Sequence, residues 1–259
     1  MWPLSFISET DFTEHVRSTI EKYGSKLEAI DLARFNSNII DPIKLIFDKT
    51  VYQSSWEEII GNEIFRQRDK ANNNDIGYFH QRIFQYMKKC EVPKAGWDVI
   101  VRDPEGIRTP DGDIVHTVYV EMKNKHNTMN AASSSDTYVK MQNKILHDDQ
   151  ATCMLVETIA KHSQNITWEV TINENGRKQK YSHKRIRRVS MDKFYEIVFG
   201  DKDAFFKLCK ALPTILDDVM VDDESAKLKN TVYEELDKTD FYKSLYLLAF
   251  KTYEGFEKF

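Results

Sequence analysis

The chain has 259 residues, of which 41% are hydrophobic and 30% are charged, and its formal net charge at pH 7 is -4. This composition excludes a disordered or fibrous protein, and no stretch approaches the ~20 apolar residues that a membrane-spanning helix needs. The apolar opening, residues 1–7, lacks the basic leader and the cleavage site of a signal peptide. Three cysteines lie far apart in the sequence, at Cys90, Cys153 and Cys209. They predict neither a disulfide framework nor a zinc site, and they favour a reducing, cytoplasmic location.

Apolar residues recur at helical spacing in roughly the first 90 residues, so we expect helices there. The first of them covers residues 11–23. A second helix, residues 56–70, begins after a pair of serines, which are typical N-cap residues. A third helix covers residues 75–89, and the three asparagines at 72–74 predict a turn between the two.

The hydrophobic period then changes from that of a helix to that of a strand. The strands that we expect are residues 96–101, 114–123, 153–156 and 166–172. A predicted turn at residues 109–113 joins the first two, which we therefore expect to pair as a hairpin. A polar stretch, residues 124–135, separates this hairpin from an expected helix over residues 136–147.

From Met191 onward the chain is expected to be helical to its end, with a break near residues 221–224. Helices before and after a compact sheet predict an α/β fold, with a mixed central sheet flanked by helices and with helical N- and C-terminal regions. No repeat, low-complexity tract or linker interrupts the sequence, which favours a single domain over residues 1–259.

The second strand of the hairpin carries unusual polar residues for a strand built to be buried. Side chains alternate along a strand, so Tyr119, Glu121 and Lys123 point to one face. Asp98 lies on the corresponding face of the first strand and can stand beside Glu121 if the two strands pair. Two carboxylates this close repel each other unless a positive group lies between them, and a hard divalent ion, most naturally Mg²⁺, meets that need. Lys123 supplies a second positive charge, suited to orienting a hydroxide or stabilising a phosphate in a transition state.

The tripeptide of an acid, any residue and lysine is a weak signal by itself. Glu121 and Lys123 form its single occurrence in the chain, and it falls at the end of a predicted strand with Asp98 upstream. On the pattern alone, an ion pair on the solvent-facing side of a partly exposed strand explains these residues equally well.

An acid on one strand, followed by this tripeptide on the next, resembles the PD-(D/E)XK nuclease superfamily, although Trp97 stands where the superfamily name expects proline. The run VYVEMKNKHNTMNAASSSDTYVKMQ, with GWDVIV and the helix DIGYFHQRIF upstream, is similar to type II restriction endonucleases of the SinI and AvaII kind. The similarity covers residues 56–156, under half of the chain. It implies Mg²⁺-dependent hydrolysis of both strands of duplex DNA at short palindromes of the GGNCC or GGWCC type. It also implies a host methyltransferase that protects the same site.

The resemblance gives the polar residues of the hairpin specific roles. Asp98 and Glu121 would ligate the metal ion together with the main-chain carbonyl of Met122, and Lys123 would lie near the scissile phosphate. The catalytic core is then expected over about residues 56–172, and a helical C-terminal region over about 190–259. Members of the superfamily often carry an additional acid on the helix before the catalytic strands. Glu63 is the best candidate there, ahead of Glu57 and Glu58, although an ordinary helix glutamate is the more common explanation.

The polar stretch after the catalytic strand is expected to contact DNA, because its start must lie within reach of the cut phosphate. The residues concerned are Asn124, Lys125, His126, Asn127, Asn130, Ser133, Ser134 and Ser135. Asparagine and lysine pair with base edges, whereas hydroxyl groups suit phosphate oxygens. A polar loop with serine caps is the alternative. In that case the basic run over residues 177–188 becomes the expected recognition element.

A palindromic site presents one half-site twice, so a two-fold symmetric homodimer is the simplest assembly that cuts both strands. Its candidate interface is the apolar C-terminal stretch with Phe241, Leu245, Leu248 and Phe250, which could equally fill the chain's own core. Two other functions stay open from the residues: another nuclease of the same superfamily that acts in repair or junction resolution, and a non-catalytic DNA-binding protein.

Overall fold

A computed structural model describes residues 2–24, 29–126, 128–174, 177–220, 230–238 and 240–250. The contacts divide the chain into two compact units. The first unit, which we call the sheet unit, comprises Met1–Thr19 and Ile76–Asp222, and the second, the helical unit, comprises Ile20–Asp75 and Asp223–Phe259. The single domain expected over the whole chain stays a prediction.

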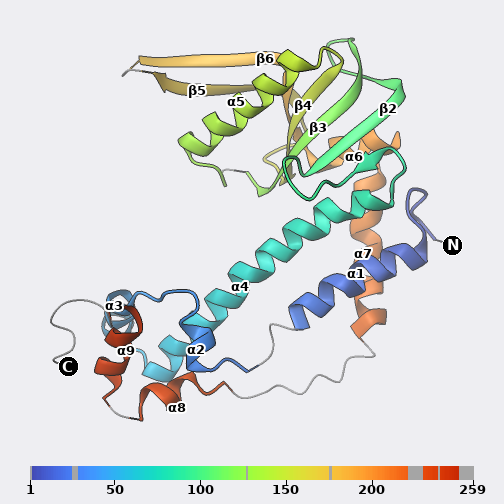
Figure 1. Cartoon of the computed structure of the whole chain (residues 1–259). Helices are drawn as coiled ribbons and strands as arrows, with labels where there is room; N and C mark the ends of the chain where they lie inside the picture. The colour runs from blue at the N-terminus through green and yellow to red at the C-terminus, as the bar shows by residue number, and fades with distance from the viewer. Residues whose placement is uncertain are drawn as a thin grey trace. The chain divides into compact units, whose positions relative to one another are not determined.

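The sheet unit is built on six strands in the order β1-β2-β3-β4-β6-β5 (Figure 1). The strands are β1 (Cys90–Glu91), β2 (Val99–Arg108), β3 (Ile114–Lys125), β4 (Ala151–Ile159), β5 (Asn165–Glu174) and β6 (Arg177–Ser190). β3 and β4, and β4 and β6, pair in parallel, whereas the other neighbours are antiparallel. The sheet is therefore mixed, and the predicted fold class is confirmed.

The expected hairpin is present as β2 and β3, which pair with Val99 opposite Val120. β2 begins three residues later than expected, and it continues to Arg108 through an irregularity in register after Arg102. The predicted turn closes with the N–H of Thr109 donating to the carbonyl of Asp113 at 2.8 Å. Gly112 has a φ of 89° in this turn, a conformation that glycine adopts without the steric cost that other residues bear.

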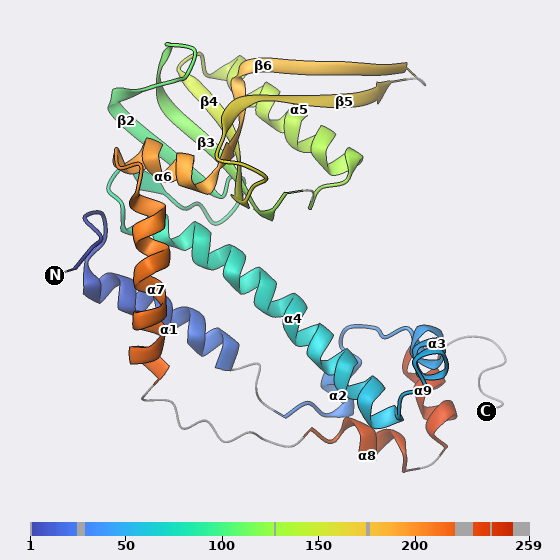
Figure 2. The ribbon, with the colours of Figure 1, turned by 180° about the vertical axis from the view of Figure 1, so that it is seen from behind.

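Helices cover both faces of the sheet (Figures 1 and 2). On one face lies α5 (Ala131–His147), whose buried Tyr138, Met141 and Ile145 share a hydrophobic cluster with Cys153 and Leu155 of β4. Against the other side pack α6 (Met191–Phe199) and the short 3₁₀ helix η1 (Ile83–Tyr86), whose aromatic rings meet in tilted and edge-to-face contacts. The longer helix α7 (Ala204–Met220) packs against α6, and α1 (Glu9–Gly24) is the first helix of the chain. α5 connects the parallel strands β3 and β4, as a crossover helix does.

The structure corrects the expected start of α5. The helix begins at Ala131, five residues before the predicted start, because Asn130 caps it by accepting the Ser133 N–H at 2.9 Å. An asparagine at this position satisfies a backbone N–H that would otherwise lack a partner. The three serines at 133–135 are therefore helical, and the expected polar loop over residues 124–135 shrinks to the few residues between β3 and α5.

The two helices expected on either side of residues 72–74 form a single helix, α4 (Trp56–Arg82), so the predicted turn is wrong. Asn73 holds the helical conformation, because its side-chain amide donates to both the carbonyl and the carboxylate of Asp69, at 2.9 and 3.0 Å. The predicted cap before Trp56 is confirmed. Ser55 and Glu58 exchange hydrogen bonds in a capping box.

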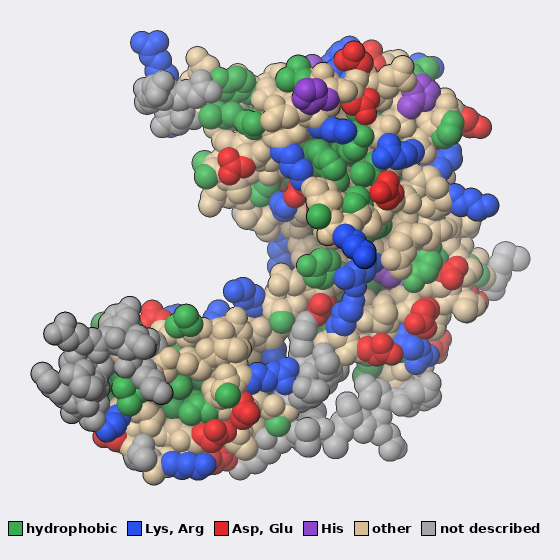
Figure 3. All heavy atoms as spheres, viewed as in Figure 1, with side chains coloured by type: hydrophobic (Ala, Val, Ile, Leu, Met, Phe, Trp, Pro, Cys, Tyr) green, Lys and Arg blue, Asp and Glu red, His purple; other side chains and the backbone are tan. Residues whose placement is uncertain are grey.

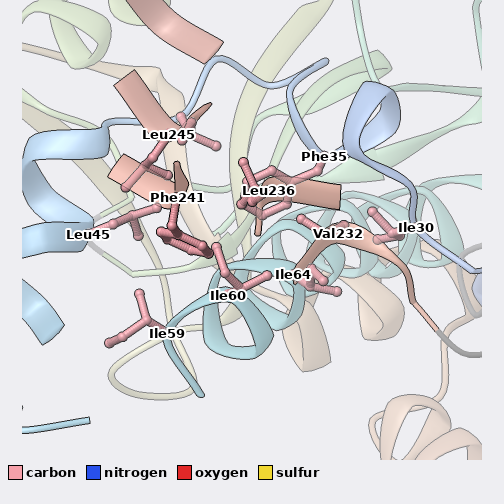
Figure 4. Packing of buried hydrophobic residues seen from close by; sticks show 11 residues of the cluster. Ile30, Phe35, Leu45, Ile59, Ile60, Ile64, Val232, Leu236, Phe241 and Leu245 are labelled. Carbon is pink, nitrogen blue, oxygen red and sulfur yellow. The ribbon is translucent and has the colours of Figure 1, made fainter. Parts of the chain in front are cut away.

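The helical unit packs around its own hydrophobic cluster (Figure 4). Its elements are α2 (Leu32–Phe35), α3 (Pro42–Tyr52), the first part of α4, α8 (Val232–Leu236) and α9 (Phe241–Phe250). Leu245 is fully buried and Phe241 nearly so, while Leu248 packs against the same cluster. Of the two expectations for this C-terminal stretch, the one that places it in the chain's own core is confirmed for these residues.

Other expectations for the C-terminal half have mixed outcomes. The helices after Met191 are confirmed in α6, α7, α8 and α9, and the predicted break at 221–224 lies outside the described residues. The basic run at 177–188 is a strand, β6, which lies between β4 and β5. The sheet therefore extends past residue 172, where the catalytic core was expected to end. Within the described part of the chain, no helix combines the length and the apolarity that crossing a membrane requires.

Candidate active site

Asp98 lies immediately before β2 and is tied to the strand β3 by two hydrogen bonds. Its N–H donates to the carbonyl of Val120 at 3.0 Å, and its Oδ2 accepts from the N–H of Met122 at 2.7 Å. The first bond continues the pairing of the hairpin, and the second fixes the carboxylate beside the middle of the predicted motif. The structure thus brings Asp98, Glu121 and Lys123 together at the end of the hairpin opposite its turn.

Glu121 is held by two lysines. Its Oε1 lies 3.2 Å from Nζ of Lys123, and its Oε2 lies 2.8 Å from Nζ of Lys140 on α5. Lys140 also donates to the carbonyl of Gly96, and its Nζ lies 4.2 Å from the centre of the Trp97 ring. Lys140 was not among the residues predicted from the sequence. Its only signal there is its place on the amphipathic helix that follows the catalytic strand.

The electrostatics of Asp98 reflect a crowded, partly dehydrated site. Burial raises the pKa of its carboxyl group, and the nearby negative charge of Glu121 raises it further. The Met122 N–H, Lys123 and Lys140 oppose this change, but the pKa stays above its usual value. A carboxyl group in this state gains from a cation, because a positive charge offsets both burial and repulsion.

The donor set fits a magnesium ion. Mg²⁺ is commonly bound by one or two carboxylates, with the remaining positions filled by water and by substrate phosphate oxygens. Asp98 and Glu121 supply two carboxylates at this point of the sheet. No cluster of three or more His, Cys, Asp or Glu side chains suited to a metal occurs among the described residues.

The expected DNA-contacting residues fall into several structural classes. Asn124 and Lys125 end β3, and Lys125 is exposed. Asn130 uses its side-chain oxygen to cap α5, and the hydroxyls of Ser133 and Ser135 donate to carbonyls of the same helix turn. Asn127 lies outside the described residues.

His126 belongs to a group of three charged or titratable side chains that we call the Glu157 cluster. Glu157 on β4 is 2% exposed and lies in register with Lys123. Its carboxylate pairs with Arg188 of β6 and lies 3.3 Å from Nδ1 of His126. Glu157 was not among the residues predicted from the sequence. It is far from the motif along the chain, and only the parallel pairing of β3 and β4 brings it beside Lys123.

Glu63 is buried in the helical unit, where neighbouring side chains on α4 engage its carboxylate. Arg66 forms two hydrogen bonds with it, at 2.5 and 2.6 Å, and Gln67 donates a third at 3.1 Å. Together with the charge of Arg66, these bonds lower the pKa of Glu63 despite its burial. The contacts favour a structural role, and the additional catalytic acid stays a prediction.

The basic run of β6 is mostly engaged within the sheet unit. Lys180 pairs with Glu169, Lys184 with Asp113, and Arg187 with Asp111. Arg185 donates to carbonyl groups at the C-terminal end of α5, and Arg188 pairs with Glu157. Of the seven basic residues, Arg177 and Lys178 are left as exposed side chains at the start of the strand. Acidic and basic side chains are interspersed on the face that Figure 3 shows.

Comparisons with known proteins agree on one class of enzyme. The family model described as Eco47II restriction endonuclease matches residues 4–221. The chain is 32% identical over 219 residues to the type II restriction enzyme Sau96I of Staphylococcus aureus, an alignment that covers 83% of this chain and 80% of the relative. It is 26% identical over 245 residues to the type II restriction enzyme Eco47II of Escherichia coli, covering 93% and 96% of the two chains.

Proposed function

The chain belongs to the Eco47II restriction endonuclease family and is a type II restriction endonuclease, and from this premise we propose that it uses Mg²⁺ to hydrolyse both strands of duplex DNA at a short palindrome of the GGNCC type. The observation that carries the catalytic part is the meeting of Asp98, Glu121 and Lys123 on one face of the β2–β3 hairpin. The resemblance of the run at 118–142 to the SinI and AvaII enzymes supports the recognition site and the membership of the PD-(D/E)XK superfamily.

Each residue of the site has a distinct task in this proposal. Asp98 and Glu121 would hold the ion, with the main-chain carbonyl of Met122 as a further ligand. Bound there, Mg²⁺ would supply Lewis-acid stabilisation of the charge that develops on the phosphate. Lys123 lies near the scissile phosphate and orients the attacking water, and Lys140 keeps Glu121 in place through its second carboxylate oxygen.

DNA contact is proposed for the segment that follows the catalytic strand. Lys125 is the clearest candidate for a phosphate contact, because it is exposed and lies two residues after Lys123. Since Asn130, Ser133 and Ser135 already bond to the backbone of α5, a role of these residues in reading bases requires them to exchange those bonds for bonds to DNA. Asn124, His126, Asn127 and Ser134 complete the proposed contact set.

Two partners follow from this function. A second copy of the chain supplies the active site for the other DNA strand, which makes a two-fold symmetric homodimer the proposed assembly. A methyltransferase that modifies the same sequence is the functional counterpart of the enzyme in a restriction system, and it acts on the DNA without needing to bind this chain. The proposed compartment is the cytoplasm.

Digestion of a plasmid of known sequence tests the proposed function. In the presence of Mg²⁺ the purified protein should give a discrete set of fragments, and mapping their ends should place every cut in a GGNCC-type sequence. Addition of a chelator should abolish cleavage. A smear of products would identify a nonspecific nuclease, and intact plasmid in Mg²⁺ would contradict the proposal. Discrete cuts at another sequence would leave the chemistry in place and correct the recognition site.

A further inference from the structure

β3, which carries Lys123, lies between β2 and β4 in the sheet. The Glu157 cluster is on the β4 side of Lys123, whereas Asp98 is on the β2 side. Neither Glu157 nor Arg188 has a part in the roles proposed above. Glu157 is nevertheless among the few charged residues of the described chain whose side chains are almost completely buried. Burial of a carboxylate is costly unless it is paired and hydrogen-bonded, so its presence beside a catalytic lysine calls for an explanation.

The cluster fixes the guanidinium group of Arg188. One terminal nitrogen, Nη2, pairs with Oε1 of Glu157 and lies 2.7 Å from Nδ1 of His126. Arg188 lies on β6, which pairs with β4, the strand that carries Glu157. In this pairing Arg188 is opposite Leu155. A guanidinium held in this way has little freedom left to lose when it binds a ligand.

Arg188 still has donors to offer. Its Nε is buried and has no hydrogen-bond partner within the described residues. The same side chain lines a small cavity of about 80 Å³ together with Lys123. The hydroxyl-bearing residues Thr128 and Ser134 also line this cavity, and Trp168 forms an apolar part of its wall.

The chemistry of the lining selects an anion that is rich in oxygen. Two cationic groups and two hydroxyls border the cavity, and Glu157, which also borders it, has its charge matched by Arg188. A base edge presents both donors and acceptors, whereas a phosphate presents acceptors alone and suits the fork of an arginine. Because Lys123 borders both this cavity and the carboxylates, a ligand here lies next to the group that is cut.

We propose that this cavity binds a backbone phosphate of the DNA adjacent to the scissile one, with Arg188 as the binding residue and Glu157 as the residue that positions it. The inference rests on the endonuclease function proposed above. In this proposal β4 and β6 help to hold the DNA strand in line with the catalytic residues.

Single-phosphate neutralisation tests this assignment. Duplexes carrying the mapped cleavage site are prepared with one methylphosphonate, an uncharged replacement, at each position around the cut in turn. Binding is measured in a chelator, so that no duplex is cleaved. Wild-type protein should lose about ten- to a hundredfold in affinity when the adjacent phosphate is neutralised, the range expected for a charged hydrogen bond.

The decisive comparison uses a double variant, Glu157→Gln with Arg188→Gln. It removes both charges together, so no unpaired charge stays buried, and its thermal unfolding should be close to that of wild type. This variant should bind the unmodified duplex about ten- to a hundredfold more weakly, and neutralising the adjacent phosphate should cause no further loss. Methylphosphonates at the other positions should weaken DNA binding by this variant by the same factors as they weaken binding by wild type. Arg188→Lys should recover part of the affinity, because it keeps the charge but not the fork.

Lys184→Gln is the matched control, since it removes an exposed charge from the same strand. It should leave the effect of the adjacent phosphate unchanged. If neutralising the adjacent phosphate weakens binding by the double variant by the same factor as it weakens binding by wild type, the two losses are independent. Arg188 then does not contact this phosphate, and the inference is overturned. Unchanged affinity in the double variant would overturn it as well. Either result leaves the digestion experiment, and with it the proposed nuclease function, unaffected.

Discussion

Lys123 stands between two acidic groups with different surroundings. On one side it pairs with Glu121, which Lys140 also holds, and on the other side it borders the cavity of the Glu157 cluster. Four charged side chains from β3, β4 and α5 are thus arranged at the C-terminal ends of the parallel strands β3 and β4. A hairpin alone provides only Asp98, Glu121 and Lys123, and these are the residues that alternation along two strands predicted.

The remaining members of the site could not be predicted from the sequence. Lys140 reaches Glu121 because α5 crosses back over the sheet, and Glu157 faces Lys123 because β4 pairs with β3 in parallel. Both contacts depend on the register of elements that are separate in the chain. A single sequence carries no signal for that register.

His80 on α4 gives the folded state a specific response to acid. Burial, assisted by the positive charge of His15, lowers the pKa of His80 to about 4. The unfolded chain therefore takes up a proton near pH 6.5, whereas the folded chain does not until about pH 4. The stability that depends on neutral His80 is therefore fully present above pH 6.5 and falls on acidification. By about pH 4 the free energy of unfolding should have dropped by at most about 3 kcal/mol on account of His80.

Urea unfolding between pH 7 and pH 4.5 measures this response. The variant His80→Gln should lose less stability over this interval than wild type, since glutamine does not titrate. The exposed His162 is the matched control, and His162→Gln should follow the wild-type curve. Equal pH dependence in wild type and His80→Gln would show that His80 is not the group responsible.

At the scale of elements, the sequence predicted those whose pattern is strong and local. The hairpin β2–β3, the capped start of α4 and the helices after Met191 were found from alternation, spacing and caps. The turn expected at 72–74 was wrong because asparagine side chains can bond within a helix as well as within a turn. No strand was predicted over β6, because its basic residues find partners on other elements that the sequence does not reveal.

α3 carries an apolar stripe that the helical unit leaves open. Ile43, Phe47 and Val51 recur four residues apart and are 49%, 66% and 67% exposed, whereas Leu45 on the same helix is buried in the core. A solvent-facing apolar row of this kind is typical of an interaction surface. Because cutting both strands needs two active sites, and Phe241 and Leu245 of the expected C-terminal interface are buried in the chain's own core, we expect a second copy to cover this stripe.

Analytical ultracentrifugation of the free protein, and of its complex with cognate DNA, checks this expectation. Wild type should sediment as a dimer, and the double variant Ile43→Glu with Phe47→Glu should shift to monomer while keeping its thermal unfolding transition. Phe206 on α7 is also 66% exposed, so Phe206→Glu controls for the loss of an exposed phenylalanine. Wild type that stays monomeric both free and on DNA would contradict the homodimer. A dimer that survives in the double variant would place the interface elsewhere.

At the scale of the whole molecule, the family match over residues 4–221 includes the complete sheet and most of the helical elements. The candidate site lies entirely within the sheet unit. The resemblance to restriction endonucleases that the sequence itself offers extends only from residue 56 to residue 156. The fold class followed from the order of helices and strands, while the division into two compact units did not, because it depends on contacts between distant segments.

The most direct test of the account is single-turnover cleavage of cognate duplex by Lys123→Ala and Asp98→Ala in Mg²⁺, with binding measured in parallel. Both variants should cleave at least about a hundredfold more slowly, since each loses a group that acts on the reacting phosphate or its metal ion. Thermal unfolding should stay close to that of wild type, and much of the affinity for the duplex should remain, because the other DNA contacts are kept. Lys125→Ala should show the reverse pattern, with weaker binding at all sequences and a smaller salt dependence. Cleavage by Lys123→Ala at a rate near that of wild type would contradict the assignment of the active site.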